Sequence, residues 1–163
     1  MTLLMGVSMQ EIFRNYGTLI IFLHILSAVV WVGGMIAIRF AVHPVLQCIE
    51  EPNVRLGKTL HIVGRLFHLV MPFIALSALC GIFILKGAGY SGGVIHLKEA
   101  IWTLMMLNYT YMYIQRLKAQ RFFNKGDIVR AKEMVRLLPT VLLPINIALG
   151  LIAIFAGVSL RGF

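Results

Sequence analysis

The sequence predicts an all-α integral membrane protein, a four-helix bundle with antiparallel neighbours and both termini on the outer side. Two observations carry the membrane assignment. Hydrophobic residues make up 60% of the 163 residues and charged residues only 13%, whereas soluble domains are about half apolar and about a quarter charged. The uncharged stretches are also long, and about 20 helical residues cross the hydrocarbon core of a bilayer. We expect a single transmembrane domain over residues 1–163.

Four uncharged runs mark the expected helices. They cover residues 15–38, 66–85, 100–115 and 137–160. The third run is shorter than the roughly 20 residues a crossing needs. Its helix must therefore draw in the preceding His96-Leu97-Lys98-Glu99 and bring a charged pair to the bilayer edge. With such flanks included, the expected helices span about 15–40, 61–86, 97–117 and 137–160.

Two hairpins, about 43–60 and 118–136, are expected to join these helices on the cytoplasmic side. Both are rich in Lys and Arg, and the positive-inside rule places such loops in the cytoplasm. Pro52 should interrupt any helix in the first hairpin, and Asn124-Lys125-Gly126 should break the second. Residues 1–14 are interpreted as an amphipathic leader at the outer interface, without a cleavable signal peptide.

The excess of basic residues indicates how the chain is oriented in the membrane. Lys and Arg number 15 against 6 Asp and Glu, a formal net charge of +9. Because the excess lies mostly in the two hairpins, it predicts an orientation in a bacterial inner membrane, and no nucleic acid partner is expected. The lipid bilayer is the expected surrounding of the chain.

Polar residues inside the uncharged runs are the candidate site residues, because polar groups in hydrocarbon are costly. At about 100° of rotation per residue, residues that share a face can be grouped. The first helix groups His24, Ser27, Ala28, Trp31 and Gly34. The second groups His61, Gly64, Arg65, His68 and Pro72, and the fourth groups Pro139, Leu143, Asn146, Gly150, Ala153 and Gly157. Small residues let helices approach closely, so we expect these faces to point inward.

Several of these residues also have a simpler interpretation. The glycines on the fourth helix are typical packing residues, and Asn108 and Asn146 are typical of hydrogen bonds between helices. His43, His61 and His96 suit the membrane interface. His24 and His68 lie inside their runs, and for them we favour a functional role.

Depth along the membrane normal separates the histidines into two groups. Because neighbouring helices are antiparallel, His24 shares the outer half with His96, Lys98 and Glu99, while the inner half holds His43, His61 and His68. At 1.5 Å per residue, His24 and His68 differ in depth by roughly 15 Å. They are therefore not expected to ligate one iron. His24 could share an iron with Lys98 only if the lysine reaches inward or its helix sits deep.

Imidazole groups inside a bundle suit three kinds of chemistry. Neutral imidazole ligates haem iron, copper and zinc, so the sequence leaves open a b-type haem, copper handling by His and Met, or a proton path using His and Arg. Haem suits the stripe around His24 best, because small residues there can open a slot between helices. Hydrolytic and nucleotide motifs are absent, and two cysteines without CxxC spacing predict no disulfide framework.

The polar pattern resembles a known family. His24, followed by Trp31, Gly33-Gly34, Arg39 and His43, resembles the first helix of HemJ-type protoporphyrinogen oxidases and of copper resistance D (CopD) membrane domains. The segments that open the third and fourth helices resemble theirs too, in His96-Leu97-Lys98 and in Arg136-x2-Pro139-Thr140-x-Leu142-Leu143. The resemblance spans the whole four-helix layout.

This resemblance implies a haem b with His24 as a ligand and Lys98 as its partner or essential neighbour. Trp31, Arg39 and His43 are then supporting positions. The chain departs from the HemJ pattern in Ala37-Ile38-Arg39, where the family has Leu-Pro-Arg, and in Leu137, where the family has an acidic residue. Because of these departures, the expected activity is not restricted to protoporphyrinogen oxidation.

The sequence thus predicts a b-type haem protein for electron transfer or for oxidation of a lipophilic or porphyrin-type substrate, which would make it a haem-dependent oxidoreductase. One haem is expected, or two if His68 ligates a second one near His61 or His43. Arg39 or Arg65 could pair with a haem propionate. The metal ligands predicted are His24, Lys98 and His68. A quinone, a porphyrin, a redox protein or a second copy of the chain are the partners considered.

Two alternatives belong to other classes of protein. A copper transporter is indicated by nine methionines, including Met1, Met5 and Met9 in the leader, because thioethers suit Cu(I). In the third interpretation, the chain is a structural or assembly subunit whose histidines only form hydrogen bonds between helices.

Overall fold

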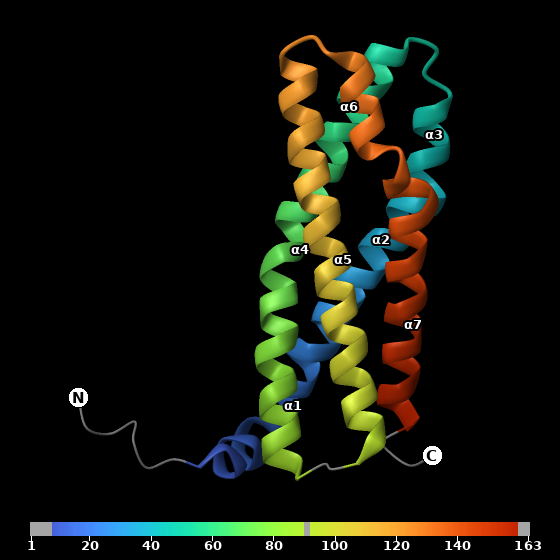
Figure 1. The fold of residues 1–163 in the computed structure, drawn as a ribbon. Helices are drawn as coiled ribbons and strands as arrows, with labels where there is room; N and C mark the ends of the chain where they lie inside the picture. The colour runs from blue at the N-terminus through green and yellow to red at the C-terminus, as the bar shows by residue number, and fades with distance from the viewer. Residues whose placement is uncertain (1–7, 90–91, 160–163) are drawn as a thin grey trace, which may run out of the picture.

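The computed structural model describes residues 8–89 and 92–159. This part of the chain is helical and contains no β-strand, which confirms the all-α prediction. Four long helical rods lie alongside one another along a common direction (Figure 1). The start of the first rod and the end of the last lie at the same end of the molecule. The turns after the first and third rods lie at the opposite end.

The first rod is a helix interrupted by two wide turns. It consists of α1 (Met9–Ala28), the π-helical turn η1 (Val29–Gly33), α2 (Gly34–Ala37), a second π-helical turn η2 (Ile38–Val42) and α3 (His43–Gln47). Ser8 begins the rod, because its hydroxyl accepts a hydrogen bond from the Glu11 N–H at 3.2 Å. The earlier leader residues, 1–7, lie outside the described part.

The second and third rods are α4 (Pro52–Ala88) and α5 (Gly93–Asn124). Both run beyond their expected ranges, so most of the expected hairpins 43–60 and 118–136 is helical. Pro52 does not shorten α4 but starts it, since its missing N–H would be unpaired in the first turn anyway. The predicted break after Asn124 is present, and Gly126 supplies the positive φ of 79° that the turn requires.

The last rod consists of α6 (Ile128–Val135), the π-helical turn η3 (Leu138–Leu142) and α7 (Leu143–Ser159). Two of the three π-helical turns, η2 and η3, are followed two residues later by Pro44 and Pro144. Proline has no N–H to donate to the preceding turn and clashes with it. A wider turn just before each proline is the local adjustment that the sequence imposes.

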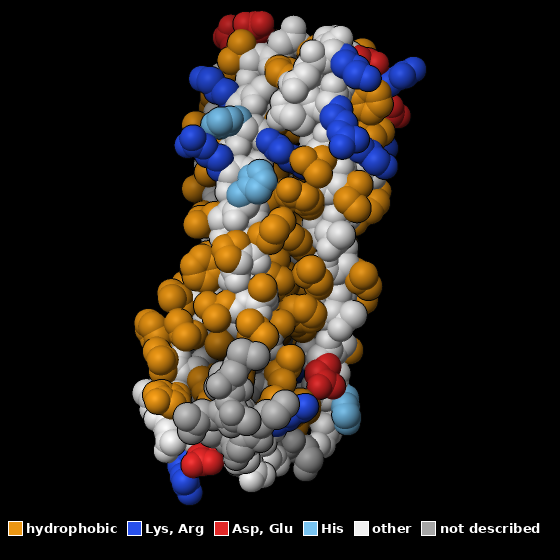
Figure 2. Space-filling model, turned by 90° about the vertical axis from the view of Figure 1, so that its left-hand side faces the viewer, with side chains coloured by type: hydrophobic (Ala, Val, Ile, Leu, Met, Phe, Trp, Pro, Cys, Tyr) orange, Lys and Arg blue, Asp and Glu red, His pale blue; other side chains and the backbone are white. Residues whose placement is uncertain are grey.

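Three helical segments are long and apolar enough to cross a membrane: Met9–Gln47, Pro52–Ala88 and Ile128–Ser159. They support the prediction of a membrane protein. The α5 helix is comparably long, with 32 residues, but it carries more charge. Figure 2 shows a hydrophobic middle, with Lys and Arg side chains gathered toward the end where the hairpins lie.

The core runs along the centre of the rods. Trp31 and Met35 from the first rod meet Phe67 and Val70 of α4 and Met105 of α5 there. A second, smaller cluster lies toward the hairpin end and consists of Leu56, Leu60, Ala119 and Ala131. The two clusters hold the rods in contact both in the middle and near the hairpins.

Candidate functional site

His24 is held in a defined orientation between α1 and α4. Its Nδ1 donates to the Ser77 carbonyl at 3.0 Å, and a Cβ placed on Gly81 would lie 3.6 Å from its Cε1. A donor bond from Nδ1 leaves the Nε2 lone pair free, which is the state of a metal-ligating imidazole. Ser77 is itself buried. The α4 helix therefore both orients the ring and, at Gly81, leaves space beside it.

Lys98 turns from α5 toward α7. Its Nζ lies only 2.9 Å from where a Cβ on Gly157 would be, so the glycine makes room for the ammonium. Lys98 is half-buried. His24 and Lys98 thus each lie beside a glycine of a neighbouring helix, Gly81 and Gly157 respectively. His24 lies between α1 and α4, and Lys98 of α5 lies against Gly157 of α7.

His96 and Glu99 lie near the same end but face away from the interior. The His96 Nδ1 and the Glu99 carboxylate are 3.3 Å apart, and both side chains are largely exposed. The predicted grouping by depth places His96 near His24, yet its ring is paired on the surface. The interfacial interpretation of His96 agrees with this position.

Trp31 is buried deeper in the bundle. It is only 3% exposed and packs edge-to-face on Tyr109, with ring centroids 6.3 Å apart. Within the described part of the chain its indole Nε1 has no hydrogen-bond partner. The nearby Tyr109 hydroxyl donates instead to the Phe67 carbonyl at 2.7 Å. Trp31 thus combines a packing role with a buried N–H that has no acceptor.

The expected inward face of the second helix is wrong for four of its five residues, because Pro72 is exposed as well. Gly64 is buried, but His61, Arg65 and His68 are exposed. His61 and His68 each follow a fully buried apolar residue, Leu60 and Phe67 respectively. A one-residue step turns a side chain by about 100°, so the helix face that buries Leu60 and Phe67 turns His61 and His68 away from the bundle.

His68 therefore lies on the outer surface of α4. Its Nε2 is 3.4 Å from the Tyr113 hydroxyl, and the two rings meet edge-to-face. Ser77, which contacts His24, lies nine residues further along the same helix, or about 14 Å at 1.5 Å per residue. His24 and His68 are therefore at clearly different depths, as the spacing predicts.

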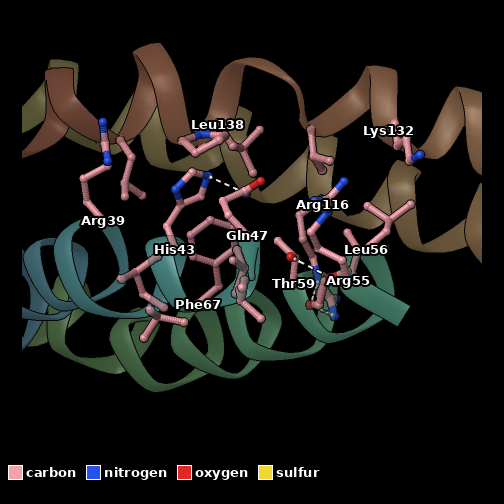
Figure 3. Close-up of a pocket in the computed structure, with 18 of the residues that line it drawn as sticks. Arg39, His43, Gln47, Arg55, Leu56, Thr59, Phe67, Arg116, Lys132 and Leu138 are labelled. Carbon is pink, nitrogen blue, oxygen red and sulfur yellow. Dashed lines mark hydrogen bonds between the residues drawn. The ribbon is translucent and has the colours of Figure 1, made fainter. Parts of the chain in front are cut away.

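Arg39 and His43 lie away from His24 and line a separate pocket at the hairpin end. Arg39 is fifteen residues beyond His24, about 22 Å along the rod. The pocket has a volume of about 210 Å³. Figure 3 shows its labelled side chains between the ribbons of α3 and α4 and those of the last rod. Arg55 from α4, Arg116 from α5 and Lys132 from α6 complete its basic lining.

Arg116 joins α5 to α4 beside this pocket. Its Nε and one terminal nitrogen donate to the Leu60 carbonyl at 3.1 and 2.9 Å, and the same terminal nitrogen donates to Gln120 at 3.2 Å. A Cβ on Gly64 would collide with the guanidinium. Gly64 is thus the residue that lets Arg116 lie flat against α4.

The asparagines form hydrogen bonds between helices, as the simpler interpretation expects. Asn108 donates to the Leu142 carbonyl at 2.8 Å and to the Asn146 side chain at 3.0 Å. Asn146 is fully buried and donates to the Met105 carbonyl at 3.3 Å. The network joins α5 to the last rod just where η3 passes into α7.

The described residues contain no group of three or more His, Cys, Asp and Glu side chains that could hold a metal ion. The methionines at positions 35, 105 and 112 are buried in the apolar core. Met1 and Met5, which the copper alternative includes, lie outside the described residues. Comparisons with protein-family models, curated proteins and solved structures find no match.

Sequence reasoning missed three residues of the pocket: Arg55, Arg116 and Lys132. Arg55 and Lys132 fall in the expected hairpins and Arg116 at the end of the expected third helix, and none of the three was predicted as a site residue. The one local signal was Gly64, since a glycine on a helix face can mark close approach of another group. Which group approaches it depends on how α5 packs on α4.

Proposed function

We propose that the chain is an integral membrane protein that binds haem b near His24 and Lys98. In this proposal it serves electron transfer or oxidation of a lipophilic or porphyrin-type substrate, as the resemblance to HemJ-type and CopD-like proteins implies. The observation that carries the proposal is the orientation of His24. Its Nδ1 donates to the Ser77 carbonyl, which leaves Nε2 available.

The donor set suits a haem iron. An imidazole nitrogen is a common axial ligand of b-type haem, and the iron supplies one-electron redox chemistry. Ser77 would fix the ring orientation and the tautomer of His24, because the second ring nitrogen of a metal-bound histidine is usually held in this way. Lys98 would help to hold the haem as a second nitrogen ligand or would place a positive charge beside it. Gly81 and Gly157 keep the facing helix surfaces small.

We further propose a four-helix membrane bundle in which α5 provides the fourth crossing. The basic hairpin end would face the cytoplasm, and the end with His24 and Lys98 would lie in the outer half. Arg39 and His43 are too far along the rod to support the same haem and are assigned to the other pocket.

The absorption spectrum of the full chain purified in mild detergent tests the haem proposal. The protein should be red, with a Soret band and the reduced α-band of a low-spin b haem. His24→Ala should abolish that signature. Lys98→Ala should shift the bands if the amine is an axial ligand, or move the reduction potential if it acts only through its charge. Gly157→Ala should act in the same direction as Lys98→Ala, because a Cβ there displaces Nζ.

His96→Ala is the matched control, because that histidine lies at the same end but pairs with Glu99 on the surface. Its spectrum should be unchanged. A colourless protein that retains stoichiometric copper would overturn the haem proposal in favour of copper handling. Loss of one and the same haem in both His24→Ala and His68→Ala would contradict the placement at His24.

A further inference from the structure

The pocket at the hairpin end is formed by all four rods. Its walls come from η2 and α3, from the first turns of α4, from Arg116 on α5, and from α6 and η3. Two of the three π-helical turns thus border one pocket. Such turns are rare and often occur at functional sites. The π-helical turn η2 of the first rod and the π-helical turn η3 of the last rod therefore both line this cavity.

The lining carries positive charge without a counterion. Arg39, Arg55, Arg116 and Lys132 line the pocket, and its described lining includes no Asp or Glu. Among residues 8–89 and 92–159 none of these four side chains forms an ion pair. Several cations around one hollow favour an anion, above all a phosphate that accepts several charge-assisted hydrogen bonds.

The rest of the lining is apolar. Leu60, Phe67 and Leu143 belong to the buried core and reach the pocket wall. The segment that supplies Arg39 and His43 also exposes Phe40 and Val45, each 68% exposed. The pocket therefore combines a basic rim with an apolar wall and lies beside a hydrophobic outer surface. A ligand that matches it has an anionic head and a hydrocarbon tail.

We propose that this pocket binds the phosphate headgroup of an anionic phospholipid of the cytoplasmic leaflet, with an acyl chain along the apolar wall. Basic pockets between membrane helices on the cytoplasmic side bind such headgroups. Arg55 and Lys132 are the phosphate-binding cations, and Arg39 adds positive charge toward the other end of the pocket (Figure 3). Arg116 borders the site but is already committed to the Leu60 carbonyl. The proposal is independent of haem binding, because His24 lies at the other end.

Lipid binding by the full chain in nanodiscs tests this proposal. Discs of phosphatidylcholine alone would be compared with discs that also contain phosphatidylglycerol, by native mass spectrometry of retained lipid and by thermal unfolding. Retained phosphatidylglycerol and a higher unfolding temperature are expected for the unmodified chain. Arg55→Gln should weaken retention about fivefold, the effect of one Lys or Arg near an anionic lipid surface, and Arg39→Gln combined with it should weaken retention further.

Lys118→Gln is the matched control, since this exposed lysine lies toward the same end but outside the pocket. It should retain the lipid as the unmodified chain does. Unfolding in phosphatidylcholine discs reports whether each variant folds, and Lys132→Gln on the exposed face of α6 replaces any pocket variant that does not. An equal loss in Lys118→Gln, or no preference for phosphatidylglycerol, overturns the proposal. Equal stabilisation by inorganic phosphate in phosphatidylcholine discs also overturns it, by assigning the pocket to a soluble anion.

Discussion

At the scale of single residues, Arg116 and Gly64 depend on each other. The guanidinium donates twice to the Leu60 carbonyl of α4, a charge-assisted contact of the kind that contributes about 1.5–3 kcal/mol. It can lie there only because Gly64 has no side chain. The contact fixes the distance between α4 and α5 beside the basic pocket.

Gly64→Ala should therefore destabilise the protein. A new Cβ would collide with the Arg116 guanidinium, and overpacking of this kind costs about 1–3 kcal/mol. Thermal unfolding in detergent measures the change. Gly33→Ala is the control, because no atom lies within 4 Å of its added Cβ. It should leave stability unchanged or raise it by about 0.5–1 kcal/mol, as alanine does in helices. Equal effects of the two substitutions would contradict the assigned role of Gly64.

At the scale of elements, the π-helical turns and the asparagine network shape the last rod. Pro139 and Pro144 interrupt regular helix hydrogen bonding around η3. Asn108 on α5 donates to the Leu142 carbonyl at the end of this turn and also to Asn146. A neighbouring helix thus satisfies a backbone group at the irregular turn, as membrane helices with proline require.

Asn146→Leu should loosen the contact between α5 and the last rod. The substitution removes the acceptor for Asn108 and the bond to the Met105 carbonyl, and hydrogen bonds between membrane helices contribute about 0.6–2 kcal/mol. The free energy of unfolding in detergent would report the loss. Thr110→Val should change little, since Thr110 bonds only within its own helix. Additive effects of Asn108→Leu and Asn146→Leu in a double-mutant cycle would show that the pair is not coupled.

At the scale of the whole molecule, positive charge is concentrated at one end. Lys and Arg gather at the hairpin end in Figure 2, while hydrophobic side chains cover the middle. The first rod begins and the last rod ends at the opposite end (Figure 1). This polarity separates two regions: the end that holds His24 and Lys98, and the basic pocket that contains Arg39.

Reporter fusions should place these ends on opposite sides of the membrane. A fusion at Asn124-Lys125-Gly126 should be active in the cytoplasm, and a fusion at Gly92-Gly93 should be active outside, because basic loops are retained in the cytoplasm. A cytoplasmic Gly92 would invert the orientation and place the basic pocket in the outer leaflet. Reporters on one side at both positions would mean that α5 does not cross.

Much of the layout was predictable because apolar runs and basic hairpins are local signals. The breaks near Pro52 and Asn124 were expected and are present, although the helices extend further into both hairpins. Helix direction and rise per residue place His24 and Lys98 in the same outer half, whereas their pairing at one haem is implied by the family resemblance. Ser77, which orients His24, could not be predicted from the sequence. It contributes a backbone carbonyl, and no sequence motif marks that group.

The sequence by itself determined the helical class, the membrane-length segments and the concentration of positive charge at one end, because these depend on composition and on spacing along one chain. Only the tertiary structure decided which side of α4 faces inward. There Phe67 and Gly64 are buried, and His61 and His68 are left outside. The packing of the helices also decided which basic residues line one pocket: Arg39, Arg55, Arg116 and Lys132. The reason is rotational: a change of one residue turns a side chain by about 100°, and contacts with neighbouring helices select the angle.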